Sequence, residues 1–285
     1  MRYSILLCLL LSFHSFAETS LWKVSQGESK MFIGGTIHVL SVSDYPLPVE
    51  FEQAYKQADM LVFETDLAVM AQPNAQQQLL QHVMYNQGKT LEDDLKPETY
   101  QALVDYVANT SLTMDALKSF KPPLVIITLL MAELNQLGMA DTGVDSFFNH
   151  KARMEGKTLG ELESFDVQLS VIENMGKGYE DEMILSAIEE MKELPLIMSE
   201  MKQAWRSGNS LLLEKIGIAE MKKDYPKLYQ LLLVNRNNAW IPKIKALLKT
   251  PETEFILVGA LHLVGKDGII STLRRQGYKV ELFKP

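Results

Sequence analysis

Residues 31–41 read MFIGGTIHVLS, and residues 255–265 read FILVGALHLVG. Each stretch is a short apolar run followed by a glycine, two further residues and a histidine, which places His38 near one end of the chain and His262 near the other. Apolar runs of this length, bounded by glycine, are typical of buried strands. If both strands belong to one sheet, the two imidazoles leave the same edge as exposed strand-end residues, where both can serve a metal ion or acid–base chemistry.

The positions beside these histidines strengthen the prediction of a shared site. Gly35 and Gly259 permit a sharp turn and a close backbone approach. Glu64 closes a third apolar run, residues 60–63, in the same position relative to its strand. A carboxylate there is costly to bury unless it is paired or metal-bound, and ligands of open α/β sheets lie beyond the carboxyl ends of the strands. We therefore predict that His38, Glu64 and His262 bind one divalent cation and leave positions open for water and substrate.

Three further residues are candidates for catalysis. Glu163 follows a predicted strand at residues 157–162 and is the first choice for general base, with Asp145, at the start of a helix, as the second. Either carboxylate could instead be a ligand or orient one, and Glu64 and Glu163 can exchange the roles of ligand and base. Arg236 is predicted to stabilise a developing negative charge or to clamp a substrate carboxylate.

The order of the segments predicts an α/β (mixed α+β) fold, with a central, mostly parallel sheet built from both ends of the chain. Helices flank this sheet, and a large helical insertion covers approximately residues 70–250 of a single domain over residues 18–285. Strands are expected at 21–24, 30–35, 60–64, 157–162, 255–258 and 278–283, and helices at 49–57, 75–86, 98–108, 124–136, 144–154 and 268–276. A further helical stretch is expected from 168 to 247, with breaks near Gly176, Pro195, Gly208 and Pro226.

Composition excludes several functional classes. The 285 residues carry a net charge of −8 without a basic cluster, which argues against a nucleic-acid partner. The sequence has no His-Glu-x-x-His helix, Gly-x-Ser-x-Gly elbow, P-loop or dinucleotide fingerprint. His82 and His150 lie on polar helical stretches and are predicted to be surface residues.

The first 17 residues have the pattern of a secretory signal peptide. Arg2 supplies the positive charge, residues 5–11 the apolar core, and Ser15-Phe16-Ala17 the small residues of a cleavage site. The sequence thus predicts a periplasmic or secreted protein without a stable membrane span. Cys8, the only cysteine, lies inside this signal, so the mature chain would have no thiol.

The combination of motifs resembles the TraB/PrgY/GumN family, which includes the Tiki proteins and is related to erythromycin-esterase-like and ChaN-like folds. The resemblance covers nearly all of the mature chain and rests on GGTIH, VFETD, GVDSFF, GKTLGELES with Gln168 after it, and the terminal block from NRNNAWIPKI to VELF. Tiki proteins are manganese- or cobalt-dependent proteases that need two Gly-x-x-His motifs, which match Gly35/His38 and Gly259/His262. The resemblance therefore implies a peptide or protein substrate and a bound Mn²⁺ or Co²⁺, with Zn²⁺ as the alternative metal.

The sequence favours a secreted metallohydrolase that cleaves peptide bonds by means of a metal-activated water. Two alternatives remain open at this stage. The same histidines would suit a peptide- or haem-binding protein without turnover, or an esterase-like hydrolase that uses histidine as a base without metal. The oligomeric state is not predicted.

Overall fold

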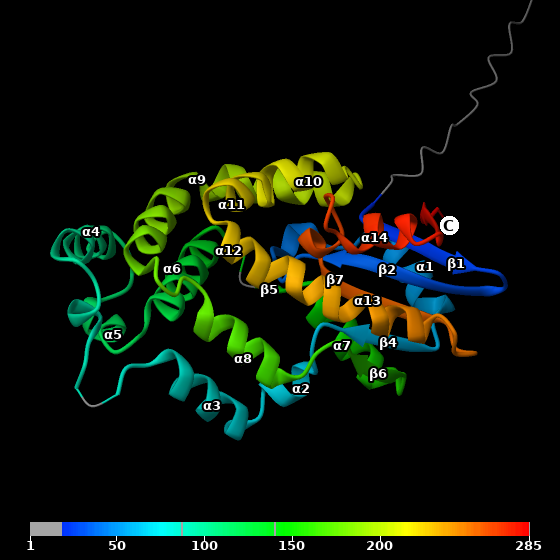
Figure 1. The fold of residues 1–285 in the computed structure, drawn as a ribbon, viewed down its shortest axis with the longest axis horizontal. Helices are drawn as coiled ribbons and strands as arrows, with labels where there is room; N and C mark the ends of the chain where they lie inside the picture. The colour runs from blue at the N-terminus through cyan, green and yellow to red at the C-terminus, as the bar shows by residue number, and fades with distance from the viewer. Residues whose placement is uncertain (1–18, 87, 140, 285) are drawn as a thin grey trace, which may run out of the picture.

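The computed structural model describes residues 19–86, 88–139 and 141–284 and confirms the predicted α/β fold (Figure 1). The predicted signal peptide and Cys8 lie outside these residues. A six-stranded sheet has the order β6-β4-β7-β2-β1-β8. Its strands are β1 (Leu21–Gln26), β2 (Ser29–Thr36), β4 (Met60–Phe63), β6 (Thr158–Glu161), β7 (Glu254–Gly259) and β8 (Lys279–Leu282).

β7 occupies the centre of the sheet although it comes late in the chain. It pairs in parallel with β2 on one side and with β4 on the other, and β4 also pairs in parallel with β6. Phe255, Ile256, Leu257 and Val258 are all fully buried, as expected of a strand covered on both faces. The carboxyl ends of β2, β4, β6 and β7 therefore meet along one edge of the sheet, which is where the two histidine motifs were predicted to converge.

The remaining strands form an antiparallel border. β1 pairs with β2 through a tight turn in which Gly27 has a φ of +61°, a conformation that favours glycine. β8 pairs antiparallel with β1 and forms the edge strand. The strands predicted at residues 21–24, 30–35 and 278–283 are thus confirmed.

Helices cover both faces of the sheet. α1 (Val49–Gln57) and α7 (Val144–Glu155) share one face, because Phe51 and Phe148 both pack on Phe255, with ring centroids 6.0 and 5.8 Å away. In Figure 1, α13 (Asn235–Leu247) and α14 (Ile269–Arg275) lie in front of the sheet, whereas α1 lies behind it. Fully burying each of these aromatic side chains stabilises the fold by roughly 1.5–3 kcal/mol.

The middle of the chain forms a helical body beside the sheet, with a hydrophobic core of its own (Figure 1). This body is built in two excursions, because the chain returns to the sheet through α7 and β6 between them. The first excursion contains α2 (Leu67–Met70), α3 (Pro73–Val83), α4 (Pro97–Val107), α5 (Met114–Leu117) and α6 (Pro122–Gln136). The second contains α8 (Phe165–Asn174) and α9 (Glu180–Arg206). It continues through α10 (Ser210–Gly217), α11 (Ala219–Asp224) and α12 (Pro226–Tyr229), where the buried Leu213 and Tyr229 belong to the core of the sheet.

The break predicted near Pro195 is wrong, since α9 runs through this residue. A proline inside a helix removes one backbone hydrogen bond. Here the neighbouring Met191 and Leu194 are buried in the helical core, and their burial offsets that loss. The breaks predicted near Gly176, Gly208 and Pro226 are present.

Some short elements were not predicted. β3 (Val39–Leu40) pairs antiparallel with β5 (Asp141–Thr142) to form a small second sheet. Residues Gln230–Val234 form a π-helical turn directly before α13. Single 3-10 turns lie at Val42–Asp44 (η1), Leu91–Asp93 (η2) and Ala260–His262 (η4). Periodicity along the sequence does not reveal elements of two to five residues, because it is recognised only over several repeats of the pattern.

Among the helices of the described ranges, none combines the length and the apolar composition that crossing a bilayer requires.

Candidate active site

Four parallel strands deliver the predicted site residues to one edge of the sheet. His38 follows β2, Glu64 follows β4, Glu163 follows β6 and His262 follows β7. The chains after β4 and β6 stay paired, because the Glu163 amide donates to the Glu64 carbonyl oxygen over 2.8 Å. The structure thus brings together side chains that are up to 224 residues apart in sequence (262 − 38).

Gly259 marks the point on which three of these side chains converge. A Cβ atom built at this glycine would lie 3.3 Å from Glu64 Oε1, 3.5 Å from His38 Nε2 and 3.6 Å from His262 Cδ2. The Gly259 amide also donates to Glu64 Oε1 over 2.7 Å. The residue at this position must therefore be small for the three predicted ligands to share one space.

The two histidines are held in matching ways at the ring nitrogen that faces away from this point. His38 Nδ1 lies 2.7 Å from Asp145 Oδ2, and His262 Nδ1 lies 2.7 Å from Asn237 Oδ1. Asn237 Nδ2 donates to the carbonyl oxygens of His262 and Asp267, so its amide oxygen must face the ring. Both acceptors are oxygens, which places the proton on Nδ1 and leaves Nε2 of each neutral ring as an acceptor or ligand.

Asp145 reaches His38 because two backbone segments lie unusually close. The Val144 amide donates to the Ile37 carbonyl oxygen over 3.0 Å. A Cβ atom at Gly143 would lie only 2.1 Å from the carbonyl oxygen of His38, so this position accommodates only glycine. The GVD sequence at the start of α7 therefore places the Asp145 carboxylate against the imidazole.

Arg236 occupies the centre of the cluster. Its Nη1 lies 3.0 Å from His262 Nε2, and its Nη2 lies 2.5 Å from Glu64 Oε2 and 2.7 Å from Glu163 Oε1. The guanidinium also stacks over the ring of Trp240, with Cζ 4.6 Å from the ring centroid. Its side chain is 11% exposed, so this is a nearly buried cation that two carboxylates neutralise.

Glu163 is 5% exposed, and both of its oxygens are already engaged. Arg236 donates to it through Nε and Nη2, Gln168 Nε2 donates to Oε1 over 2.9 Å, and Trp240 Nε1 donates to Oε2 over 2.8 Å. With four donor atoms on its two oxygens, this carboxylate holds its neighbours in place.

Buried charge sets the protonation of the cluster. Burial raises the pKa of Glu64, but the neighbouring positive charges and the Gly259 amide outweigh it and hold the value at about 2. Burial lowers the pKa of His262 to about 3, so this ring is neutral at pH 7, and Arg236 and His38 are the cations that keep Glu64 ionised. Asp145 raises the pKa of His38, whose side chain is 65% exposed, so that water screens part of the rise.

His262 was predicted to be an exposed strand-end residue, and this prediction is wrong. The residue is 4% exposed and its ring packs against Trp240, with centroids 4.5 Å apart. The η4 turn after β7 folds it back under α13, whereas the chain after β2 continues outward and leaves His38 accessible. Accessibility at a strand end depends on the turn that follows, which the short apolar pattern does not specify.

Two hollows flank the cluster. The first, of about 280 Å³, is lined by His38, Glu64, Asp145 and Ser146 among others. The second, of about 570 Å³, is lined on its inner side by Glu163 and Arg236. The Glu163–Arg236 pair thus faces a different space from His38 and Asp145.

Asn237, Trp240 and Gln168 are site residues for which the sequence predicts no role. Asn237 follows Arg236 directly and could have been singled out as its neighbour, and Gln168 belongs to a family motif. Their functions depend on how α13 and α8 pack against strand ends far away in the sequence. His82 is a surface residue as predicted, 2.8 Å from Glu173, and His150 is exposed on α7.

The described residues contain no set of three His, Cys, Asp or Glu side chains that is already arranged around a common metal position. His38, Glu64 and His262 are nevertheless of the ligand types that Mn²⁺, Co²⁺ and Zn²⁺ accept. The guanidinium of Arg236, which lies on the Nε2 atom of His262, would have to shift before a cation could contact that nitrogen.

Comparison with known families assigns residues 20–282 to the TraB/PrgY/gumN family profile. No curated protein and no solved structure matches the chain.

Proposed function

The chain belongs to the TraB/PrgY/gumN family, and on this premise we propose that it is a divalent-metal-dependent hydrolase that cleaves peptide bonds. The observation that carries the proposal is the convergence of His38, Glu64 and His262 on the space beside Gly259. Side chains from three separate strands meet there at the carboxyl edge of the sheet, where α/β enzymes bind their substrates.

The residues fit a divalent cation in their chemistry. His38 Nε2 lies at the common space and His262 Nε2 lies 3.9 Å from Glu64 Oε1, while an oxygen acceptor holds Nδ1 of each ring. This arrangement supports histidine ligands in metalloproteins. Glu64, Glu163 and Asp145 are three carboxylates beside the guanidinium of Arg236, and the raised pKa of His38 adds a second cation to the metal-free cluster. A dication that displaced the proton of His38 would balance the three carboxylates together with Arg236. Such an ion, when bound, supplies Lewis acidity and lowers the pKa of its water.

We assign the metal contacts to His38, Glu64 and His262, and thus propose Glu64 and not Glu163 as the carboxylate ligand. Glu64 Oε1 lies at the convergence point, whereas the oxygens of Glu163 are bound by Arg236, Gln168 and Trp240. Glu163 is thus a positioning residue that holds the Arg236 guanidinium.

Asp145 is then the better candidate for the proton acceptor. Its Oδ2 holds His38, while Oδ1 has no hydrogen-bond partner among the described residues. The side chain is 10% exposed and lines the hollow of about 280 Å³ beside His38. A carboxylate oxygen that faces the substrate space can accept a proton from a nucleophilic water.

Arg236 supports the reaction as a fixed positive charge. Two carboxylates and the Trp240 ring hold its guanidinium. In a site with little water, a fixed cation lowers the free energy of negative charge that develops on a substrate carbonyl oxygen.

A second candidate function is hydrolysis without metal, in which His38 acts as the base. The contact between Arg236 Nη1 and His262 Nε2 favours this alternative, because it provides the cluster with a cation of its own. The Asp145–His38 pair resembles the carboxylate–imidazole arrangement of metal-free acyl hydrolases.

One experiment separates these functions. Elemental analysis of the purified protein is combined with cleavage of a peptide library, with chelator and after adding back Mn²⁺ or Co²⁺. Loss of cleavage on chelation and its recovery with either ion would support the metallohydrolase, whereas cleavage that persists in chelator would support the metal-free hydrolase. A fully metallated protein that cleaves no peptide would contradict both hydrolase functions and favour a binding protein. A visible absorption spectrum would then test whether this protein binds haem.

We also propose that the protein acts outside the cytoplasm, in the periplasm or after secretion. Support comes from the positive, apolar and small-residue segments of residues 1–17. The intact mass of the protein from its native host should correspond to a chain that begins at Glu18. A mass that includes Met1 would contradict this proposal.

A further inference from the structure

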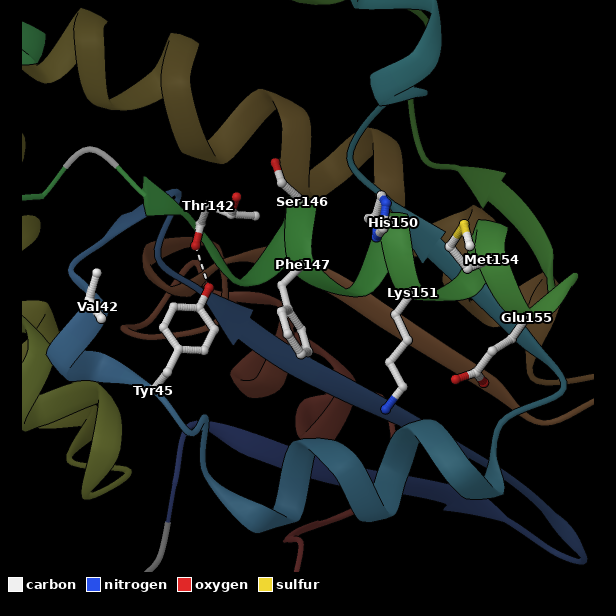
Figure 2. A pocket seen from close by; sticks show the side chains of 9 residues that line it. All are labelled: Val42, Tyr45, Thr142, Ser146, Phe147, His150, Lys151, Met154 and Glu155. Carbon is white, nitrogen blue, oxygen red and sulfur yellow. Dashed lines mark hydrogen bonds between the residues drawn. The ribbon is translucent and has the colours of Figure 1, made fainter.

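A large groove lies next to the candidate active site, on the outer face of α7. It has a volume of about 930 Å³ and is shown in Figure 2. Six of the residues that line it belong to α7: Ser146, Phe147, His150, Lys151, Met154 and Glu155. Their spacing of three and four residues places them on one side of the helix, opposite the side that packs on the sheet.

The groove adjoins the hollow beside His38. Ser146 lines both spaces, and the preceding residue, Asp145, holds the His38 ring. Figure 2 shows the groove residues in order along α7, from Ser146 at the end near the site to Met154 and Glu155 at the other end. Whatever occupies the groove at Ser146 is therefore next to the proposed reaction centre.

The wall of the groove is apolar and partly exposed. Val42 is 76% exposed and Met154 is 75% exposed. Between them, the half-buried Phe147 ring packs against Tyr45, with centroids 5.6 Å apart. Rigid aromatic rings beside a flexible methionine are typical of surfaces that bind apolar side chains.

The charged groups at the far end of the groove are already paired with α1. Lys151 Nζ lies 2.6 and 2.7 Å from the two carboxylate oxygens of Glu52, and Glu155 Oε2 accepts from the Tyr55 hydroxyl over 2.7 Å. These contacts engage both the Lys151 ammonium and the Glu155 carboxylate, so neither group is free to bind a charged ligand. The groove therefore favours neutral, apolar groups.

We propose that this groove binds the polypeptide substrate of the neighbouring site, as an extended segment whose apolar or aromatic side chains contact Val42, Phe147 and Met154. The inference rests on the proposed function and adds the substrate preference to it. From Ser146 to Met154 the helix rises by about 12 Å, at 1.5 Å per residue. An extended peptide advances about 3.3 Å per residue, so the groove accommodates about four residues on one side of the cleaved bond.

Photolabelling tests this proposal without requiring turnover. The wild-type protein, treated with chelator, is irradiated with a library of random octapeptides that carry one benzoylphenylalanine each, and the labelled positions are mapped by mass spectrometry. We expect labels on residues 144–155 and on η1, with apolar residues enriched in the captured peptides. Val42→Glu and Met154→Glu should each reduce this labelling at least about fivefold, since a charge in an apolar contact is unfavourable.

Leu211→Glu on α10 is the matched control, because Leu211 is an 80% exposed apolar residue outside the groove. Its labelling should equal that of the wild type. Labels concentrated elsewhere, or labelling that Met154→Glu leaves unchanged, would overturn the proposal. A dimer that Met154→Glu dissociates would also overturn it, because the groove would then hold a second copy of the chain.

The groove and the proposed function fail in distinguishable ways. Labelling on α7 without cleavage of any peptide by the metallated protein would support the groove as a peptide-binding site. It would contradict the proposed hydrolase activity. If the protein cleaves peptides with a sequence preference, and Val42→Glu and Met154→Glu do not alter this preference, the hydrolase activity is supported. The proposal that the groove binds the substrate is then contradicted.

Discussion

Nη1 of Arg236 lies 3.0 Å from Nε2 of His262, so a guanidinium rests on the nitrogen lone pair that would face a bound cation. The same guanidinium pairs with Glu64 and Glu163. Arginine and a metal ion therefore compete for two of the three proposed ligands. This competition makes the occupancy of the site sensitive to a single side chain.

Replacing Arg236 by Gln should increase the affinity for Mn²⁺ by about tenfold, which corresponds to about 1.4 kcal/mol. The variant removes the competitor at His262 and leaves two buried carboxylates without their cation, which destabilises the metal-free fold. Titration calorimetry measures the affinity, and added Mn²⁺ should raise the melting temperature of the variant more than that of the wild type. Arg153→Gln, which removes a surface pair with Asp66, is the control. An affinity equal to or below that of the wild type would contradict the proposed competition.

Replacing His38 by Ala, or His262 by Gln, should each lower the affinity for Mn²⁺ or Co²⁺ by at least about a hundredfold, because each loses a ligand. His38→Ala should keep the melting temperature of the metal-free protein, since its side chain is 65% exposed. His262→Gln should lower that temperature because the ring packs on Trp240. His82→Ala is the surface control. If both variants retain one full equivalent of metal, the histidines do not share an ion.

Replacement of Asp145 by Asn and by Ala separates its two proposed roles. The Asn side chain can still accept the Nδ1 hydrogen of His38, as Asn237 does for His262, so metal affinity should fall less than about tenfold. Turnover should fall at least about a hundredfold because the proton acceptor is lost. Asp145→Ala should reduce both quantities further. Near-normal turnover of Asp145→Asn would show that another group takes the proton.

Glu163→Gln should lower the melting temperature, because it removes one of the two carboxylates that neutralise the buried Arg236. Its amide oxygen can still accept from the guanidinium, so turnover should fall less than about thirtyfold, with the metal retained. A fall of a hundredfold or more at unchanged stability would restore Glu163 to the role of general base. Loss of the metal would instead identify it as a ligand.

Glu254 provides a test of stability away from the site. It is 1% exposed at the start of β7; Thr250 donates to its Oε1, while its Oε2 has no partner among the described residues. Burial raises its pKa, so the carboxyl favours the fold below the unfolded-state pKa of about 4.3, and this contribution is lost as the pH rises through the folded-state pKa.

Glu254→Gln remains uncharged throughout, so it should melt higher than the wild type at pH 7, by about 2–4 °C for each kcal/mol regained. The difference should disappear below about pH 4. Glu252→Gln, an exposed neighbour, is the control and should have little effect. A stabilisation by Glu254→Gln that persists unchanged at low pH would point to packing and not to ionisation.

Much of the fold could be predicted because its signals are local. Apolar runs that end in glycine located β2 and β7, a run that ends at Glu64 located β4, and these strands proved to be parallel as predicted. The family assignment from the same motifs is confirmed. The helix break predicted near Pro195 is wrong because the burial of neighbouring residues stabilises α9 there. A local sequence pattern contains no information about that burial.

The candidate site was predictable as a set of residues but not as a network. His38, Glu64 and His262 each end an apolar run, so their meeting follows from the parallel sheet. The partners of Glu163 do not follow, since Arg236 is 73 residues away and approaches it from another helix. Helix rotation and the π-helical turn before α13 set that approach, and neither has a sequence signal of its own.

The central position of β7 has a consequence for how the protein is made. β2 and β4 touch only through this late strand, so a chain that stops before Glu254 has two separate half-sheets and lacks His262. Synthesis proceeds from the amino terminus, and contacts between distant segments form last. We expect the emerging polypeptide to be inert until β7 has been made and has paired with β2 and β4, so that the site matures only after this late strand is in place.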